Sequence, residues 1–320
     1  MNKYRNVLCS IVAVAVLVAV PARLTAKPND ITLHRLTTLD DCPLNEFCPD
    51  QLAFRKLMRE FGYAVSPGKI LPGETHGFGG GFFGMLGHIT MISNDDDFWK
   101  KGTQENNPDS TLFLYQLTGQ FVLVPYLLEW GFTIGYLFTT SDTTIGFNVK
   151  TSPFEGFRKK WYGWFPDIAF GFGMNRLVGD DEISMTTGTA DVTLSYPFAP
   201  GGFIVLTPFV SIAFVGVVAE SELIDATPNT NAFDESMCPI NQGSAPGSAI
   251  NCTNRSDDYN NSLKFSREWI YYLRISYGIR LIYELLHVSI YGSHGHQVMS
   301  EANDPGGTLG QFGFSLGLDF

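Results

Sequence analysis

The chain has 320 residues, a formal net charge of −11, 17% charged residues and 14% aromatic residues. Soluble domains usually carry about 25% charged residues, so the composition is unusual for one, and the negative charge argues against a nucleic-acid partner. The mean hydropathy of +0.04 does not exclude a membrane protein, because apolar and polar residues that alternate along a strand cancel in an average.

The amino terminus has the pattern of a secretory signal peptide. Lys3 and Arg5 precede an apolar run from residue 7 to 20, and the small residues of Leu24-Thr25-Ala26 come before Lys27. We therefore predict a signal peptide over residues 1–26. The alternative, a membrane anchor, needs more than these apolar residues to cross about 30 Å of hydrocarbon as a helix. No later run is long enough either, so a mature chain integral to a membrane must cross it as strands.

An even set of cysteines remains after residue 26. Because the chain is expected to be exported, we interpret them as two disulfides that each close a short loop. The pairs are Cys42 with Cys48 and Cys238 with Cys252. A zinc site is the alternative, but neither pair is C-x-x-C and no His lies beside them. We therefore predict no metal and no cofactor.

The segment 27–73 contains one helical pattern, over about residues 50–61. Its apolar positions follow the i, i+3, i+4, i+7 spacing of an amphipathic helix, and the basic residues lie largely on the other face. The apolar stripe is Phe54, Leu57, Met58 and Phe61, and the basic residues are Arg55, Lys56 and Arg59.

From residue 74 onward the apolar residues repeat with a period of two, which is typical of strands that are apolar on one face. Turn-forming residues separate ten such segments, of which the fourth is short, so eight or twelve strands remain possible. The segments lie at about 75–92, 111–123, 130–139, 145–150, 167–175, 187–196, 204–214, 268–283, 287–296 and 308–320. A long polar segment at about 220–265 separates the seventh from the eighth.

The last segment, TLGQFGFSLGLDF from Thr308 to Phe320, alternates strictly and ends on an aromatic residue. It resembles the closing strand of bacterial outer-membrane β-barrels, whose terminal aromatic residue is read by the barrel-assembly machinery. The resemblance implies an all-β, antiparallel, up-and-down transmembrane barrel over residues 74–320, in the outer membrane of a Gram-negative bacterium. Phe320 would be the assembly signal, and outer-membrane lipid and lipopolysaccharide would be the surroundings of a monomer.

An even strand number places both ends of the barrel on the periplasmic side, so the segments after odd strands face outward. These segments hold the acidic clusters at 95–97, 180–182, 234–235 and 257–258. Their carboxylates suit divalent cations that bridge lipopolysaccharide. Simple solvation of exposed loops is the preferred interpretation.

Charged residues also occur at positions whose parity faces the lumen: Lys150, Asp167, Asp191, Glu268, Arg274 and Arg280. They would either select permeating solutes or form a salt-bridge network that fills the barrel. Filling is favoured, because open porins have about sixteen strands. We therefore expect a narrow, partly plugged channel or transport protein, or a surface structural protein.

The amphipathic helix is expected to plug the periplasmic mouth. Its stripe would cover apolar residues of the seventh strand whose parity faces the lumen, namely Phe203, Val205, Phe209 and Val215. The basic residues would then face Asp167 or Asp191, or the periplasm. The competing interpretation is a helix that lies on the inner leaflet of the membrane.

Two other classes of protein are alternatives. An outer-membrane hydrolase or metal site would use Ser293, His294 and His296 beside Glu301, but imidazoles also suit a membrane interface, and no catalytic role is expected. A secreted β-sandwich adhesin would not need aromatic residues at both strand ends. Here one predicted rim holds Trp130, Tyr196 and Tyr283, and the other holds Trp269 and Tyr271.

Overall fold

The computed structural model describes residues 27–38, 48–68, 72–76, 79–125, 127–154, 165–225, 262–298 and 307–320. Within these ranges the helices are short: η1 (Leu33–Arg35), α2 (Gln51–Val65), α3 (Asp97–Gly102) and η3 (Pro200–Gly202). None of the helices in these ranges has the length and apolar character needed to cross a membrane. The predicted residues Cys42, Cys238, Cys252 and Glu301 lie outside the described residues.

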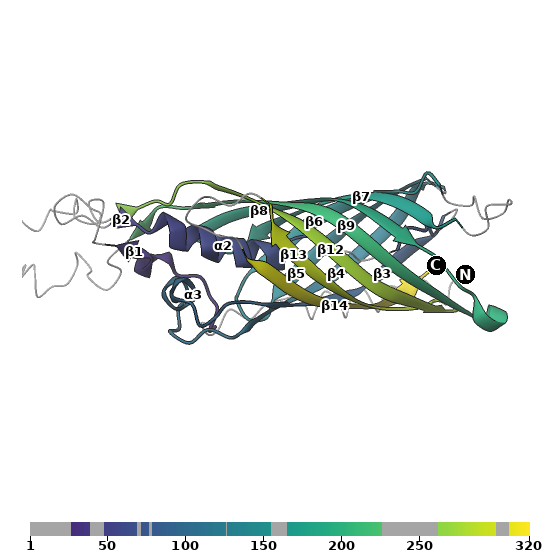
Figure 1. Cartoon of the computed structure of the whole chain (residues 1–320), viewed down its shortest axis with the longest axis horizontal. Helices are drawn as coiled ribbons and strands as arrows, with labels where there is room; N and C mark the ends of the chain where they lie inside the picture. The colour runs from purple at the N-terminus through teal and green to yellow at the C-terminus, as the bar shows by residue number, and fades with distance from the viewer. Residues whose placement is uncertain are drawn as a thin grey trace, which may run out of the picture.

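Ten antiparallel strands close into a barrel, as the sequence predicted. Each strand pairs with its neighbours along the chain, and β14 pairs with β3 to close the ring (Figure 1). The strands are β3 (Gly81–Met91), β4 (Thr111–Val124), β5 (Leu128–Leu137), β6 (Thr143–Thr151), β7 (Asp167–Val178), β8 (Ile183–Ser195), β9 (Ile204–Ser221), β12 (Glu268–Tyr283), β13 (Leu286–Gln297) and β14 (Thr308–Asp319). The short fourth segment is thus a full strand, β6, whereas the first strand begins at Gly81 and not near residue 75.

The barrel has two distinct ends. At the terminal end, β3 begins and β14 finishes, and the backbones of Gly81 and Phe320 exchange hydrogen bonds of 2.7 and 2.9 Å. At the loop end lie the connections after β3, β5, β7, β9 and β13. The loop end also carries two small antiparallel pairs, β1 (Thr37–Thr38) with β2 (Cys48–Pro49) and β10 (Ile224–Asp225) with β11 (Ser262–Leu263).

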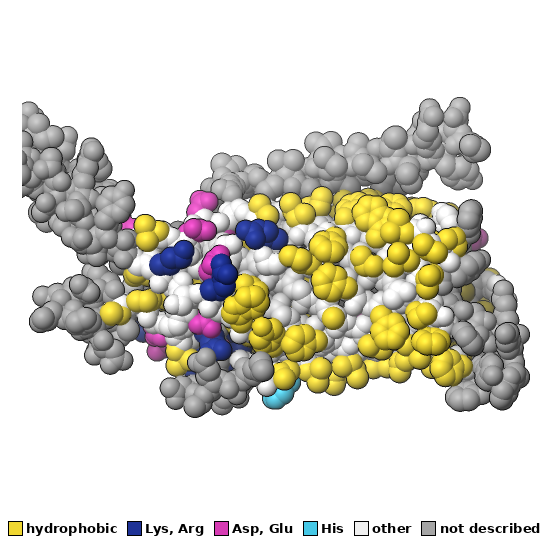
Figure 2. Space-filling model, turned by 90° about the horizontal axis from the view of Figure 1, so that it is seen from above, with side chains coloured by type: hydrophobic (Ala, Val, Ile, Leu, Met, Phe, Trp, Pro, Cys, Tyr) yellow, Lys and Arg dark blue, Asp and Glu magenta, His cyan; other side chains and the backbone are white. Residues whose placement is uncertain are grey.

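The outer wall of the barrel is apolar. Outward-facing residues such as Phe172 and Ile212 are about half exposed, at 48% and 54%, and apolar side chains cover the wall in Figure 2, whereas charged side chains gather toward the loop end. Trp130 and Tyr283 are exposed near the terminal end and Trp269 near the loop end. This is the surface expected of strands that face lipid between two aromatic girdles.

Inside the loop end lies a hydrophobic core. It joins α2 and the N-terminal segment to lumen-facing residues near the loop ends of the strands, including Leu112, Leu137, Leu177, Val217 and Ile270. The core exists because several strands carry apolar residues on both faces over the few residues nearest this end. The lumen there is therefore packed like the interior of a soluble domain.

Candidate functional site

Helix α2 lies inside the loop end of the barrel. Asp50 caps its N-terminus by accepting a hydrogen bond of 2.9 Å from the Ala53 amide. The predicted apolar stripe is completely buried, with Phe54, Leu57, Met58 and Phe61 all at 0% exposure. The Phe54 ring stacks on Phe265 at 4.6 Å between centroids. At about 1.5 to 3 kcal/mol per buried side chain, this stripe supplies a large part of the free energy that holds the plug.

The position of the helix corrects the sequence prediction. We expected α2 in the mouth where the barrel begins and ends, but it occupies the opposite mouth. The alternative of a helix on the membrane surface is also wrong, because the stripe packs against the wall, with Gly62 facing Val217. Of the strand residues that the stripe was to cover, Val215 is buried in this core. Phe203 is 64% exposed beside the turn between β8 and β9.

A buried glutamate connects the plug to the loop between β3 and β4. Glu60 is 1% exposed, and its Oε2 accepts hydrogen bonds from the Ser93 amide at 2.8 Å and from Trp99 Nε1 at 2.7 Å. Its Oε1 lies 3.7 Å from Arg59 Nη2. Since these donors satisfy the carboxylate, a charge can be buried beside the apolar stripe without a large penalty.

Arg55 of the helix pairs with a carboxylate at the rim of the loop end. Arg55 Nε lies 3.4 Å from Glu268 Oε2, and Gln51 Nε2 donates to the same carboxylate at 2.5 Å. The expected partners Asp167 and Asp191 are near the other end of the barrel. Glu268 therefore holds the outer turn of α2 at the loop end instead of lining a passage.

The wall of the barrel caps the C-terminus of α2. The last carbonyl groups of a helix lack partners within it. Here Asn175 Nδ2 donates to the Val65 carbonyl at 2.9 Å, and Arg274 donates to Ser66 Oγ at 2.9 Å and to the Pro67 carbonyl. The predicted lumen charge Arg274 is thus a fixed clamp on the end of the plug.

Beyond the helix, the described residues 66–68 and 72–76 lie progressively nearer the terminal end, and we call them the strap. The Gly73 amide donates to Ser195 Oγ at 2.9 Å, and its carbonyl accepts from Ser152. The Lys150 ammonium donates to the Glu74 carbonyl at 2.7 Å. Side chains at the terminal ends of β6 and β8 therefore hold the strap through its backbone.

A cluster of charges surrounds the end of the strap. Glu129 accepts from Lys150 at 2.8 Å and from the His76 amide at 2.7 Å. The ring nitrogen Nε2 of His76 lies 2.7 Å from Asp319 Oδ1. Glu74 forms an ion pair with Arg280, which also donates to Thr207. The predicted charges Lys150 and Arg280 are thus neutralised in a network that fills the lumen.

Part of this cluster has the bonding order of a hydrolase triad. His287 Nδ1 lies 3.1 Å from Asp319 Oδ2, and His287 Nε2 lies 3.1 Å from Ser315 Oγ. However, Ser315 is 1% exposed, its hydroxyl is 2.5 Å from that of Ser289, and the Phe82 ring lies 4.5 Å from the imidazole. A nucleophile in this position has no room for a substrate, so the arrangement serves packing.

The sequence-based alternative of an enzyme site on β13 fails on geometry. His294 and His296 are exposed on the outer face, whereas Ser293 is buried in the lumen, because successive residues of a strand point to opposite faces. Ser293 Oγ lies 3.2 Å from Tyr63 Oη, and His294 Nε2 lies 3.1 Å from Tyr277 Oη. Ser293 and His294 therefore cannot act together.

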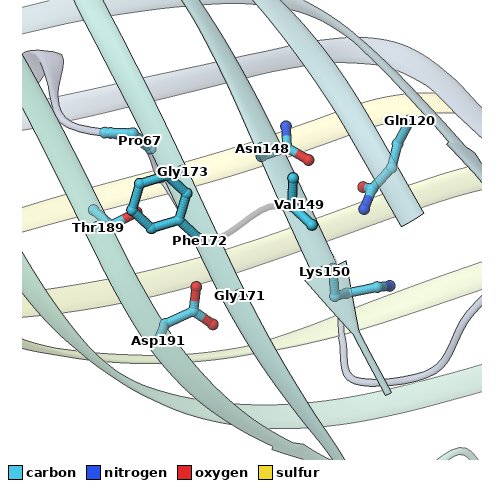
Figure 3. Close-up of a pocket in the computed structure, with 11 residues that line it drawn as sticks. Pro67, Gln120, Asn148, Val149, Lys150, Gly171, Phe172, Gly173, Thr189 and Asp191 are labelled. Atoms are coloured by element: carbon cyan, nitrogen blue, oxygen red, sulfur yellow. The ribbon is translucent and has the colours of Figure 1, made fainter. Parts of the chain in front are cut away.

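A small cavity of about 50 Å³ remains beside the strap. Figure 3 shows it between Pro67 and the small residues of the wall, with Lys150 and Asp191 at the side nearer the terminal end. Asp191 Oδ1 accepts from Thr193 Oγ1 at 3.0 Å. A water needs about 10 to 15 Å³ by this measure, so the cavity suits a few waters or one small ion and no larger solute.

Several functional residues were missed in the sequence. Glu129, His76, Glu74, His287 and Asp319 complete the charge network, and Glu60 anchors the plug. The strand residues among them share the lumen-facing parity, which was the available signal. Asp167 is 1% exposed, and Cys48 is disulfide-bonded.

The fold and its filled lumen define a plugged β-barrel with an apolar outer wall. No protein-family model matches the chain, and no curated protein matches it. Among solved structures, it is similar to the N-terminal β-barrel domain of Pseudomonas aeruginosa OprF, at 10% identity and a TM-score of 0.28, over 75% of this chain and 99% of that one.

Two further structures give similar values. Neisserial surface protein A matches at 7% identity and a TM-score of 0.30, over 78% of this chain and 99% of its own. The translocator domain of autotransporter NalP from Neisseria meningitidis matches at 8% identity and a TM-score of 0.36, over 85% and 95%. Likenesses of this size carry no functional inference.

Proposed function

We propose that the protein spans the outer membrane of a Gram-negative bacterium as a closed monomeric barrel and serves as a surface structural protein, without catalysis or a cofactor. The observation that carries this proposal is the plug: α2 fills the loop end with a buried apolar stripe that belongs to the hydrophobic core. An open pore needs a lumen filled with water, whereas this lumen is occupied by a segment of its own chain.

The membrane setting is supported by the outer wall. Its half-exposed Phe, Ile and Leu side chains would be costly in water over so large an area, and a closed ring of strands leaves no unpaired edge for lipid to meet. A secreted β-sandwich would instead bury these faces between two sheets. Purified protein that stays monodisperse without detergent would contradict the membrane proposal.

The partners follow from the same setting. Lipid would contact the wall, the barrel-assembly machinery would read Phe320, and lipopolysaccharide would border the loop end. Asp95, Asp96 and Asp97 line an open groove there with Asp50 and Lys56. Because the groove is open and contains a cation of the chain itself, we retain solvation as the role of this acidic cluster.

Conductance across a planar bilayer tests the closed state. We expect the whole protein to show no large conductance steps, and Gly62→Ile to show them. A Cβ at Gly62 would lie 2.5 Å from Val217 Cγ1, so the larger residue forces α2 away from the wall. Lys56→Ile is the control on the same helix. Large steps from the unaltered protein would overturn the proposal.

A second function, a narrow passage for water or small ions, is favoured by the cavity beside the strap. Thr189 lines this cavity, so Thr189→Phe should abolish any small residual sodium current of the whole protein. Gly188→Phe is a matched control, because position 188 has the outward parity of β8 and nothing close enough to obstruct a side chain. Equal currents in both variants would reject the passage.

A further inference from the structure

We infer that the N-terminal segment of the mature chain crosses the membrane through the lumen of its own barrel, so that residues 27–38 and 48–50 lie on the outer face. Both ends of the barrel, Gly81 and Phe320, then lie on the inner face. This inference rests on the proposed function, because it takes the barrel to span the outer membrane with its loop end outward. It gives the lumen a further role, as the route by which a polypeptide segment is carried to the surface.

The first step is where the segment begins. Lys27 Nζ donates to Tyr136 Oη at 2.6 Å and to the Thr140 carbonyl at 3.0 Å. The Asn29 amide donates to the Thr139 carbonyl at 3.2 Å. Tyr136 lies near the end of β5, and Thr139 and Thr140 belong to the connection from β5 to β6, which is at the loop end. The first described residues are therefore at the mouth remote from Gly81.

The segment is also fixed at this mouth by other loops. Asp30 Oδ1 accepts from the Ser141 amide at 2.8 Å, and Glu182 Oε2 accepts from the Leu33 amide at 2.5 Å. The Thr32 amide donates to the Gly102 carbonyl at 3.0 Å. Three different connections thus hold residues 30–33, and Leu33 itself is fully buried in the core.

The second step is the route between the two mouths. The ring of strands is closed, so a chain that runs from the loop end to Gly81 passes either inside the barrel or around it. Its contacts place it inside: Val65 meets Asn175, Gly73 meets Ser195, and His76 meets Asp319. All of these wall residues are buried in the lumen, and they follow one another from the loop end toward the terminal end.

The third step is that the wall is fitted to this segment. Small lumen-facing residues leave the space that the strap takes, and a Cβ at Gly173 would lie 3.0 Å from Pro67 Cβ. Wall side chains satisfy the backbone at Val65, the last residue of α2, and at Pro67, Gly73 and Glu74 of the strap. Buried backbone groups without such partners would be strongly destabilising. The strap is therefore an integral part of the lumen.

Cysteine labelling on intact cells tests this topology, with a maleimide that does not cross membranes. Arg35→Cys reports on the N-terminal segment. Leu223→Cys marks the loop end independently, since Leu223 is 62% exposed just after β9. Ala199→Cys marks the terminal end, in the exposed turn between β8 and β9. The unaltered chain gives the background, and labelling in detergent shows that each thiol is reactive.

We expect labelling of Arg35→Cys and Leu223→Cys on intact cells and of Ala199→Cys only after the membrane is opened. Labelling of Leu223→Cys without Arg35→Cys, when both react in detergent, would overturn the inference and leave the closed surface barrel standing. Labelling of Ala199→Cys on intact cells, or protection of Leu223→Cys, would instead overturn the orientation in the proposed function, and the inference with it.

Discussion

The two halves of the lumen differ in chemistry, although the same ten strands line both. In the half toward the loop end, Leu114, Val217 and the stripe of α2 form an apolar core. In the half toward the terminal end, Glu129, Lys150 and Asp319 hold the strap through ion pairs and hydrogen bonds. The wall thus changes from apolar to charged within single strands, such as β5, in which Leu137 belongs to the apolar core and Glu129 to the charged cluster.

This difference implies separate roles for the two halves, one in closing the barrel and the other in positioning the strap. Apolar packing gains free energy from area alone and depends little on salt. A buried ion pair gains little over an apolar replacement, but it is strongly destabilising when one partner is removed. We therefore expect the loop-end half to keep the barrel shut and the terminal half to set the path of the strap.

The largest effect is expected from Phe320, which belongs to the terminal end alone. Its backbone closes the seam with Gly81, and its ring is 50% exposed. Deleting Phe320 removes both seam hydrogen bonds and the expected assembly signal, so most of the chain should remain unfolded in the periplasm. Heat-modifiable migration of the outer-membrane fraction measures the assembled share.

Two substitutions separate the causes. Phe320→Ala keeps the backbone seam and should assemble poorly if the aromatic ring is the signal, whereas Phe320→Tyr should assemble normally. Full assembly of the deletion variant would refute the role of Phe320.

The next largest effect tests the apolar half. Phe61→Asp places a charge in the core without a partner, and we expect it to destabilise docking of α2 by about 3 to 5 kcal/mol. Limited proteolysis should then cut the N-terminal segment, and the bilayer conductance should rise. Leu52→Asp is the matched control on the same helix, since Leu52 is 38% exposed. Equal resistance of both variants would show that α2 does not depend on its stripe.

The strand pattern was predictable because each strand of the barrel has two faces in different surroundings, the apolar outer wall and the lumen. In β5, Trp130 and Ile134 face outward and Gly131 and Thr133 face inward, so the alternation in the sequence predicts the pairing faces directly. The charged lumen positions followed from the same parity. The partners of Glu129 did not follow from parity. Lys150 lies opposite Glu129 because of the register between β5 and β6, and His76 reaches it because of the path of the strap.

The mouth that holds the plug was predicted wrongly for a reason visible in the sequence. Of the four residues that the helix was expected to cover, Phe203, Val205 and Phe209 lie at or near the beginning of β9, and Val215 lies toward its other end. There Val215 and Val217 continue the lumen-facing parity as apolar residues, and Leu112 and Leu114 do the same in β4. Strands that turn apolar on both faces at one end indicate the end that a helix covers.

A smaller effect is expected from the charged half. Glu129→Gln leaves the buried ammonium of Lys150 without its counter-charge while an acceptor oxygen remains, so we expect a loss of about 1 to 3 kcal/mol. The midpoint of urea unfolding in detergent measures it. The double variant Glu129→Gln with Lys150→Met removes the pair and should recover most of the loss. If the double variant is less stable than Glu129→Gln, the two charges are not coupled.

The smallest effect concerns Asp180, in the loop between β7 and β8 at the loop end. Burial, and to a smaller extent the nearby Asp142 carboxylate, raises the pKa of Asp180 to about 7. Because the pKa in the unfolded chain is about 4, the folded chain binds more protons between these values. The stabilising contribution is therefore complete below about pH 4 and is lost as the pH rises through about 7.

Asp180→Asn should remove this dependence. The amide oxygen of Asn can still accept from the Glu182 and Ile183 amides, which Asp180 Oδ1 binds at 2.7 and 3.0 Å, while the repulsion from Asp142 disappears. At pH 8 we expect a gain of about 1 kcal/mol, which raises the Tm by about 2 to 4 °C, and near pH 4 we expect no difference. Asp181→Asn, at the exposed neighbouring position, should change neither value. A Tm difference between Asp180→Asn and the unaltered chain that stays constant from pH 4 to 8 would mean that Asp180 does not titrate in this range, and that the loop end gains its stability from packing alone.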